Sequence, residues 1–169
     1  MKTIATAKLS KNSFNDLTKY LEKYRSAIED GTKSAIEKLT EATLIAVKSY
    51  CYSNGIVNHT SNIKSEYNKE TNTGKVFTND SVIIFNEMGT GVTGKNSPHP
   101  KPNKNFISWK YDINNRGEKG WIYPKEDGTF GWTKGLPSRH MFYDAFKQIE
   151  PLVKPTITIE ITKTIKDIY

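Results

Sequence analysis

Cysteine is almost absent from this sequence, because Cys51 is the only one among 169 residues. An internal disulfide is therefore excluded, and a structural zinc site would lack its usual soft ligands. Long apolar runs are absent too. No stretch approaches the roughly 20 residues that a membrane-spanning helix needs, and residues 1–5 do not begin a signal peptide. We expect a protein made in the cytosol, with no membrane contact.

Reactive side chains are few and scattered. His59, His99 and His140 lie far apart beside turn-forming residues, without the i, i+4 spacing of a metal-binding pair. Residues 89–94 lack the Gly-Lys-Ser/Thr ending of a phosphate-binding loop. We therefore expect no catalytic residues, no metal and no cofactor. A small hydrolase or toxin that depends on His99 or His140 is the enzymatic alternative.

Length and composition favour one globular domain over residues 1–169. Apolar residues make up 36% of the chain and aromatic residues 11%, which is enough for a core. The net charge is +7, and residues 92–139 hold nine basic and four acidic residues, so five of the seven charges lie there. Such a basic segment is compatible with nucleic acid nearby, with an acidic protein partner, or with solubility alone.

Residues 13–53 have the pattern of a long helix. Ser13 and Asp16 resemble a capping box, and apolar residues follow at spacings of three and four. Such a helix would be about 60 Å long, whereas a compact domain of this size is about 40 Å across. We expect the helix either to break at Gly31-Thr32 or to overhang, in which case another subunit covers its stripe. The apolar positions are Phe14, Leu17, Leu21, Tyr24, Ile28, Ala35, Leu39, Ala42, Ala46 and Tyr50.

Residues 56–133 have the signals of strands and turns. One hairpin is expected over residues 63–78 and a second over residues 121–133, and the β-branched run at 81–85 predicts a strand covered on both faces. Weaker strands are expected at 4–9 and 106–109. Residues 86–120 form a loop long enough to suggest a function or a partner.

The second predicted hairpin is rich in aromatic residues. Trp121 and Tyr123 would share one face with Phe130 and Trp132 of the partner strand, which gives cross-strand aromatic pairs. The favoured interpretation is that these side chains form a core face. The alternative is a nucleic-acid-binding module, in which the aromatic and lysine side chains of residues 104–139 stack on bases and contact phosphates.

The C-terminal segment, residues 136–169, is expected to be helical. Met141, Phe142, Ala145 and Phe146 begin an apolar stripe that should pack on the rest of the fold. Residues 156–162 alternate as in a strand, but isoleucines also continue the helical phase, so a helix is favoured. The predicted fold is α+β: a small antiparallel sheet flanked by a long N-terminal helix and a C-terminal helix.

The order of these parts resembles a known family. A long helix and a hairpin precede an apolar segment that ends in Phe85-Asn86-Glu87-Met88-Gly89-Thr90-Gly91, and an irregular loop follows. Gly120-Trp121-Ile122-Tyr123, Trp132-Thr133-Lys134-Gly135 and Met141–Phe146 come next. Over residues 10–155 this is similar to the tail-component family of tailed bacteriophages typified by HK97 gene product ten. The family has an aromatic residue where Met88 stands here.

The resemblance implies a structural virion protein at the upper end of a phage tail, in tail completion, head-tail joining or a neck ring. It implies a cyclic and hexameric assembly of identical copies, contact with tail-tube and connector proteins, and transient contact with DNA in the channel. Glycines at 89 and 91 permit a sharp turn. Glu87 would pair with a lysine or arginine of an adjacent subunit. The implied interface residues are Phe85, Glu87, Met88, Gly89, Thr90 and Gly91.

Overall fold

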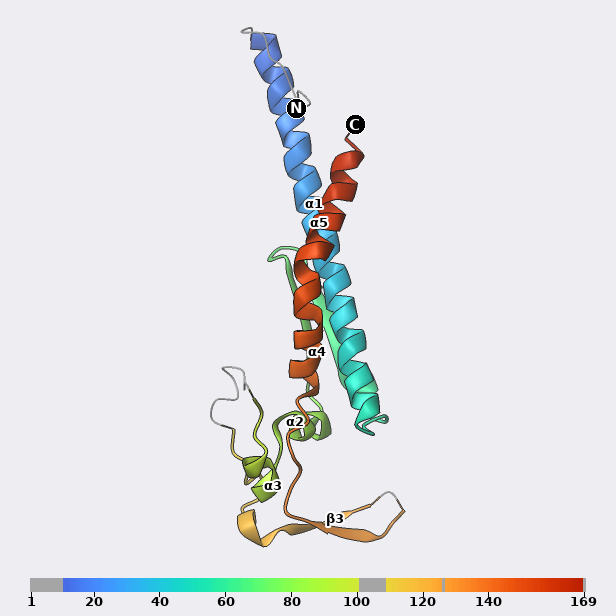
Figure 1. Ribbon diagram of the computed structural model, residues 1–169, viewed down its shortest axis with the longest axis vertical. Coiled ribbons are helices and arrows are strands. Elements are labelled where there is room, and N and C mark those ends of the chain that lie inside the picture. Colours follow the sequence, from blue (N-terminus) through green and yellow to red (C-terminus); the bar gives the residue numbers. More distant parts are fainter. Residues whose placement is uncertain (1–10, 101–108, 126, 169) are drawn as a thin grey trace.

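The computed structural model describes residues 11–100, 109–125 and 127–168 (Figure 1). The predicted α+β class is confirmed, with two separate two-stranded antiparallel sheets. The expected strand at 4–9 and most of the one at 106–109 lie outside the described residues. The helices are α1 (Lys11–Ser53), α2 (Ser81–Met88), α3 (Gly91–Asn96), α4 (Met141–Ile149) and α5 (Val153–Lys166), and the strands are β1 (Ile63–Asn68), β2 (Thr73–Thr78), β3 (Trp121–Pro124) and β4 (Phe130–Thr133).

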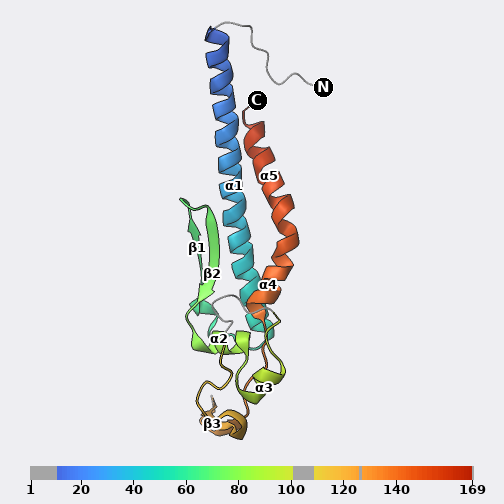
Figure 2. The same cartoon turned by 90° about the vertical axis from the view of Figure 1, so that its left-hand side faces the viewer.

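Helix α1 is continuous, so the expected break at Gly31-Thr32 is wrong. The helix is already formed at Lys11, two residues before the predicted cap at Ser13. Gly31 is buried where α1 and α5 approach each other, and a Cβ atom there would lie 2.6 Å from Ile161 Cα. Glycine therefore serves close helix packing at this position. The helix overhangs instead, because the first turns of α1 extend past the end of α5 (Figures 1 and 2), and the cover by another subunit stays a prediction.

Helices α4 and α5 run back along α1 and are joined by the 3-10 turn η4 (Glu150–Leu152). The predicted helix over residues 156–166 is confirmed, and Pro155 is tolerated in its first turn. Glu160 fixes α5 on α1, because it accepts hydrogen bonds from Ser34 and Lys38 as well as from Lys163. These three donors lower the pKa of Glu160 to about 2.

Strands β1 and β2 form the first predicted hairpin, and both pack on α1 (Figure 2). Along β2, half-buried residues alternate with exposed residues. A Cβ atom at Gly74 would overlap the side chain of Thr40, so glycine allows the hairpin to lie close to the helix. The hairpin therefore covers one side of α1, while α4 and α5 cover another.

Residues 81–85 are helical, so the predicted strand is wrong. Asp80 caps α2 by accepting hydrogen bonds from the backbone N–H groups of Val82 and Ile83. An aspartate immediately before an apolar run is a helix-start signal, and here it overrides the β-branched composition. Ile83 is fully buried nevertheless, so the segment contributes to the core as expected.

The core lies between the C-terminal half of α1, the start of β1, α2 and α4. Cys51 Sγ contacts Met141 Sδ at 3.6 Å, and both residues are fully buried. Burial raises the pKa of the Cys51 thiol to about 11, with a smaller contribution from the negative charge of Glu87. The thiol therefore acts as a small apolar group. The buried apolar residues of this cluster are Ala46, Val47, Cys51, Ile56, Ile63, Ile83, Met141, Ala145 and Ile149.

Candidate assembly surfaces

Glu87 joins three segments at the end of α2. Its carboxylate accepts hydrogen bonds from the backbone N–H groups of Phe142 and Tyr143, at 2.9 and 3.2 Å, and thereby caps α4. His99 Nε2 lies 3.0 Å from the same carboxylate, and its side chain is buried. A negative charge at a helix N-terminus is favourable. Glu87 is thus engaged within its own chain, and the expected pair with a neighbouring subunit stays a prediction.

The Gly-Thr-Gly segment after Glu87 forms a clasp with residues 134–138. Thr90 and Leu136 exchange two backbone hydrogen bonds of 2.9 and 3.1 Å. Gly89 and Gly91 have φ values of +79° and +61°, and a Cβ atom at Gly91 would overlap the backbone of Lys134. The predicted sharp turn is confirmed. Because Met88 to Gly91 are buried inside this clasp, they do not form the exposed subunit interface that the resemblance implies.

Phe85 is half-buried and lies beside Trp109. Its ring lies 6.2 Å from that of Trp109, and Trp109 Nε1 donates a 2.8 Å hydrogen bond to the Gly89 carbonyl. The Gly91 N–H donates to Tyr111 O at 2.7 Å. The clasp therefore holds the chain on both sides of residues 101–108, and it fixes the base of the second hairpin.

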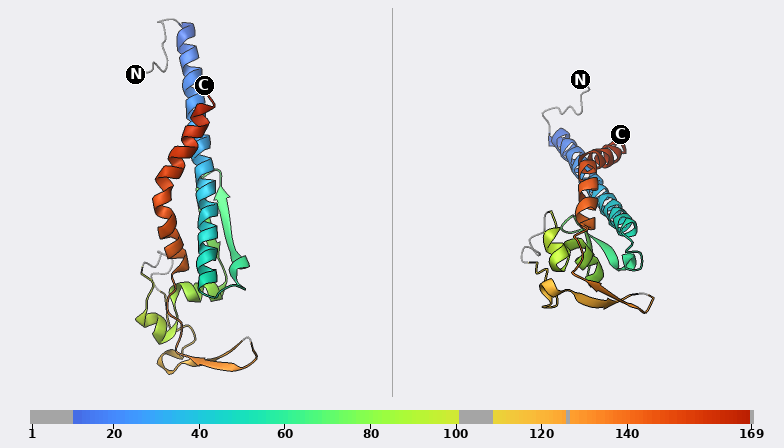
Figure 3. Two further views of the ribbon diagram at one scale, coloured as in Figure 1. Left: turned by 45° about the vertical axis from the view of Figure 1, so that its right-hand side comes forward. Right: turned by 60° about the horizontal axis from the view of Figure 1, so that its bottom comes forward.

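Strands β3 and β4, here called the arm, project to one side beneath the helices (Figures 1 and 3). The second hairpin is confirmed, but the predicted aromatic pairs are wrong. Trp121 lies opposite Thr133, and Ile122 lies opposite Trp132. This register differs by one residue from the expected one, which turns each partner to the other face.

The arm is not a core face, contrary to the favoured interpretation. Phe130 is 73% exposed and Trp132 is 60% exposed, and both share a face with Ile122 and Pro124. Lys134 Nζ lies 5.8 Å from the Trp132 ring centroid. The arm therefore presents apolar and aromatic side chains, with a lysine beside them, away from the body of the protein.

A second exposed apolar surface lies on the N-terminal part of α1, from its overhanging turns to the level of Thr164 in α5. Phe14, Leu21 and Ile28 recur every seven residues and thus share one face of the helix. Phe14 is 52% exposed and Leu21 is 59% exposed, and Ile28 is also exposed. We call these three residues the α1 ridge. A stripe of this spacing is typical of a helix that packs against another element.

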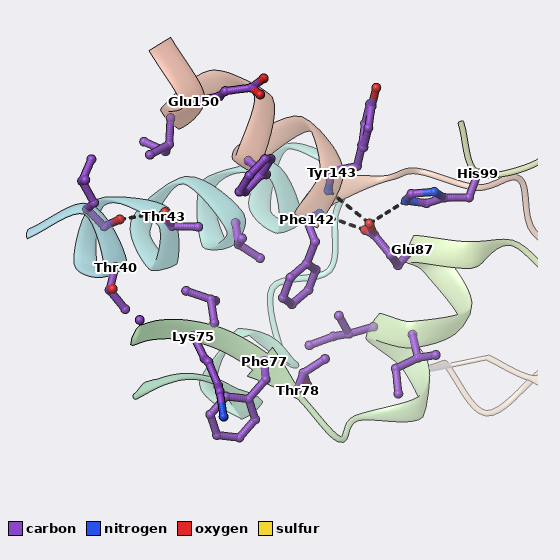
Figure 4. Close-up of a pocket in the computed structure, with 18 of the residues that line it drawn as sticks. Thr40, Thr43, Lys75, Phe77, Thr78, Glu87, His99, Phe142, Tyr143 and Glu150 are labelled. Atoms are coloured by element: carbon purple, nitrogen blue, oxygen red, sulfur yellow. Dashed lines mark hydrogen bonds and ion pairs between the residues drawn. The ribbon is translucent and has the colours of Figure 1, made fainter. Parts of the chain in front are cut away.

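A groove runs between β2 and α4, with α1 as its floor (Figure 4). Its volume is about 730 Å³, and most of its lining is apolar. Phe146, expected to pack within the fold, is 60% exposed on the α4 wall, whereas Met141 and Ala145 are fully buried and Phe142 is half-buried. Glu87, His99 and Tyr143 meet at one end of the groove. The apolar lining includes Leu39, Val76, Phe142, Phe146, Ile149 and Val153.

The fold brings together two of the histidines that are distant in the sequence. The rings of His99 and His140 lie 6.4 Å apart, and Tyr143 contacts both. His140 Nδ1 lies 2.7 Å from Asp144, while His59 pairs separately with Asp80 at 2.8 Å. Across the part of the chain that the structure describes, no group of three or more His, Cys, Asp or Glu side chains is arranged to hold a metal.

Among the described residues, no helix is both long enough and apolar enough to cross a membrane. Comparison with family models, with curated proteins and with solved structures finds no match to this chain.

Sequence reasoning located the α1 ridge and the aromatic arm but missed the groove and the role of Glu87. The arm was identified by its alternating aromatic residues, although its face was misassigned. Glu87 caps a helix that begins 54 residues later in the chain, so no local pattern signals that role. The groove depends on how α4 lies relative to β2, which sequence spacing does not define.

Proposed function

We propose that this protein is a structural subunit without catalytic activity that assembles with copies of itself at the upper end of a phage tail or phage-tail-like particle. Its position there would be that of a tail-completion, head-tail joining or neck protein. The order of its motifs supports the family resemblance. The proposal places it in the virion, as a ring that contacts tail-tube and connector proteins.

One observation carries the proposal: large apolar side chains are exposed at both ends of an elongated chain. The α1 ridge lies at one end, and the arm with Phe130 and Trp132 lies at the other. Scattered exposed apolar residues are ordinary, but clusters on one face mark interaction sites. Different patches at two ends suit a head-to-tail contact, which closes into a ring when its rotation permits.

The test is to image particles from cells that make a tagged form of the chain. Density of a closed ring at the upper end of the tail is the expected result. A variant carrying Phe130→Ser and Trp132→Ser should fold normally but be recruited less, because these exposed side chains contribute to contacts rather than to the core. Particles with no copies in the neck region would contradict the proposal.

The exposed arm favours one second candidate, a single-strand nucleic-acid-binding module. Trp132 and Phe130 are positioned for base stacking, and Lys134 lies beside Trp132 for a phosphate contact. Such binding would be tight and would fall steeply with salt. Filter binding to single-stranded DNA at two salt concentrations separates the candidates, because the structural proposal expects only weak, unspecific affinity from a ring around DNA.

A further inference from the structure

Resting on the proposed function, the geometry points to one specific contact between copies: the α1 ridge of one copy lies in the groove between β2 and α4 of the next. The ridge consists of Phe14, Leu21 and Ile28. The groove offers Phe146 and Val153 on its α4–α5 wall and Leu39 on its floor. An amphipathic helix laid into an apolar groove is a common mode of protein recognition.

The ridge is a single row of large apolar side chains. Its three side chains span about 21 Å along the helix, at 1.5 Å per residue. The next residue in the same row is Ala35, which is fully buried within the fold. The row therefore changes from small and buried to large and exposed towards the N-terminal end of α1. Large apolar side chains placed where the described chain provides little cover indicate a partner surface.

The groove can accept side chains of this kind. Its volume of about 730 Å³ exceeds that of a packing defect and falls in the range of ligand-binding pockets. Phe146 is the clearest signal, because it is 60% exposed although it belongs to a helix that packs its other apolar residues on α1. In Figure 4 the groove opens between the β2 strand and the helix that carries Phe142 and Tyr143.

The ridge and the groove of one copy do not meet each other. The groove floor is formed by residues 36–47 of α1, and the ridge precedes it on the same unbroken helix. Because α1 does not break, its first turns cannot fold back over its own later turns. A second copy supplies the same ridge, so one ridge and one groove per chain allow the contact to repeat around a closed assembly.

Disulfide trapping tests this contact. Purified Leu21→Cys and Phe146→Cys variants are mixed at high concentration with dissolved oxygen and a copper catalyst, which oxidises two thiols to one disulfide. Each residue lies midway along its surface, so the trap works for either helix direction. Lys23→Cys mixed with Lys154→Cys is the matched control, because both positions are exposed and lie off the two surfaces. The buried Cys51 should not react.

The expected result is a heterodimer on a non-reducing gel for Leu21→Cys with Phe146→Cys, at least tenfold above the control pair. Disulfides between two Leu21→Cys chains alone would indicate a two-fold pairing of ridges and would overturn the inference. So would a small molecule that copurifies in the groove by native mass spectrometry. If particle images show rings of this protein but the disulfide between Leu21→Cys and Phe146→Cys does not form, only this contact is refuted. If particle images show no copies of the protein, the proposed function itself is refuted.

Discussion

Around Cys51, near one end of α1, the side chains of Val47, Ile83 and Met141 are fully buried, whereas near the other end Phe14 and Leu21 are more than half exposed. The buried end is also where polar groups find partners, as when Glu87 caps α4. The two ends of one helix thus use apolar residues differently. At the first end they hold the chain together, and at the second they are available to another molecule.

The largest difference between the two ends of α1 should appear when a core residue and a ridge residue are each truncated to alanine. We expect Ile83→Ala to lower the free energy of unfolding by about 2–5 kcal/mol, because it leaves a cavity in a fully packed region. Leu21→Ala should change it by less than about 0.5 kcal/mol, because the side chain is already exposed. Urea titration followed by circular dichroism measures both. Equal losses would mean that the ridge is part of the folded core.

Gly31→Ala tests the close approach of α1 and α5. Alanine favours a helix over glycine by about 1 kcal/mol, yet here its Cβ would lie 2.6 Å from Ile161 Cα. We expect the steric effect to dominate, with a net destabilisation of about 1–3 kcal/mol. Thermal unfolding checks this, with Lys23→Ala at an exposed position of the same helix as the control. A more stable Gly31→Ala protein would contradict the packing.

Glu87→Ala tests the junction between α2 and α4. We expect a loss of about 1–2 kcal/mol, because the first turn of α4 loses its cap and its favourable charge. Glu87→Gln should lose less, since an amide oxygen still accepts a hydrogen bond. The exposed Glu22→Ala is the control. Unfolding curves that show no difference between Glu87→Ala and the control would exclude the capping role.

Acid should weaken the contact between α1 and α5. The hydrogen bonds from Lys163, Lys38 and Ser34 lower the pKa of Glu160 from its ordinary 4.5 to about 2. A depressed pKa in the folded state means that the stabilisation is complete above about pH 4.5 and is lost as the pH falls towards 2. The melting temperature of the wild type should therefore drop more over this range than that of Glu160→Gln. Parallel curves for the two proteins would refute this role.

The sequence was most informative where local signals and tertiary structure agree. The 3.6-residue period predicted α1 and α5, and turn residues predicted both hairpins, because these signals act within a few residues. The β-branched run at 81–85 led to the wrong prediction of a strand, because the preceding Asp80 caps a helix there. The predicted helix break at Gly31 was wrong as well, because this glycine serves close packing against Ile161, which is 130 residues away in the chain.

The candidate surfaces were predictable only in part. Spacings of three and four residues predicted the apolar stripe that contains the α1 ridge, but which part of the stripe is buried depends on where α5 and β2 pack. Which side chains share a face of the arm depends on the register of β3 against β4. One residue more or fewer in the turn shifts this register and moves each side chain to the other face. Nothing local could predict the groove, because its walls come from β2 and α4, which lie more than 60 residues apart.

Hydrogen exchange of the wild-type chain at low and high concentration tests most directly whether a second copy completes these surfaces. We predict that backbone amides of residues 11–28 and 142–153 gain protection together as concentration rises, while residues 44–51 remain equally protected throughout. Full protection of residues 11–28 in the dilute monomer, unchanged at high concentration, would contradict the account.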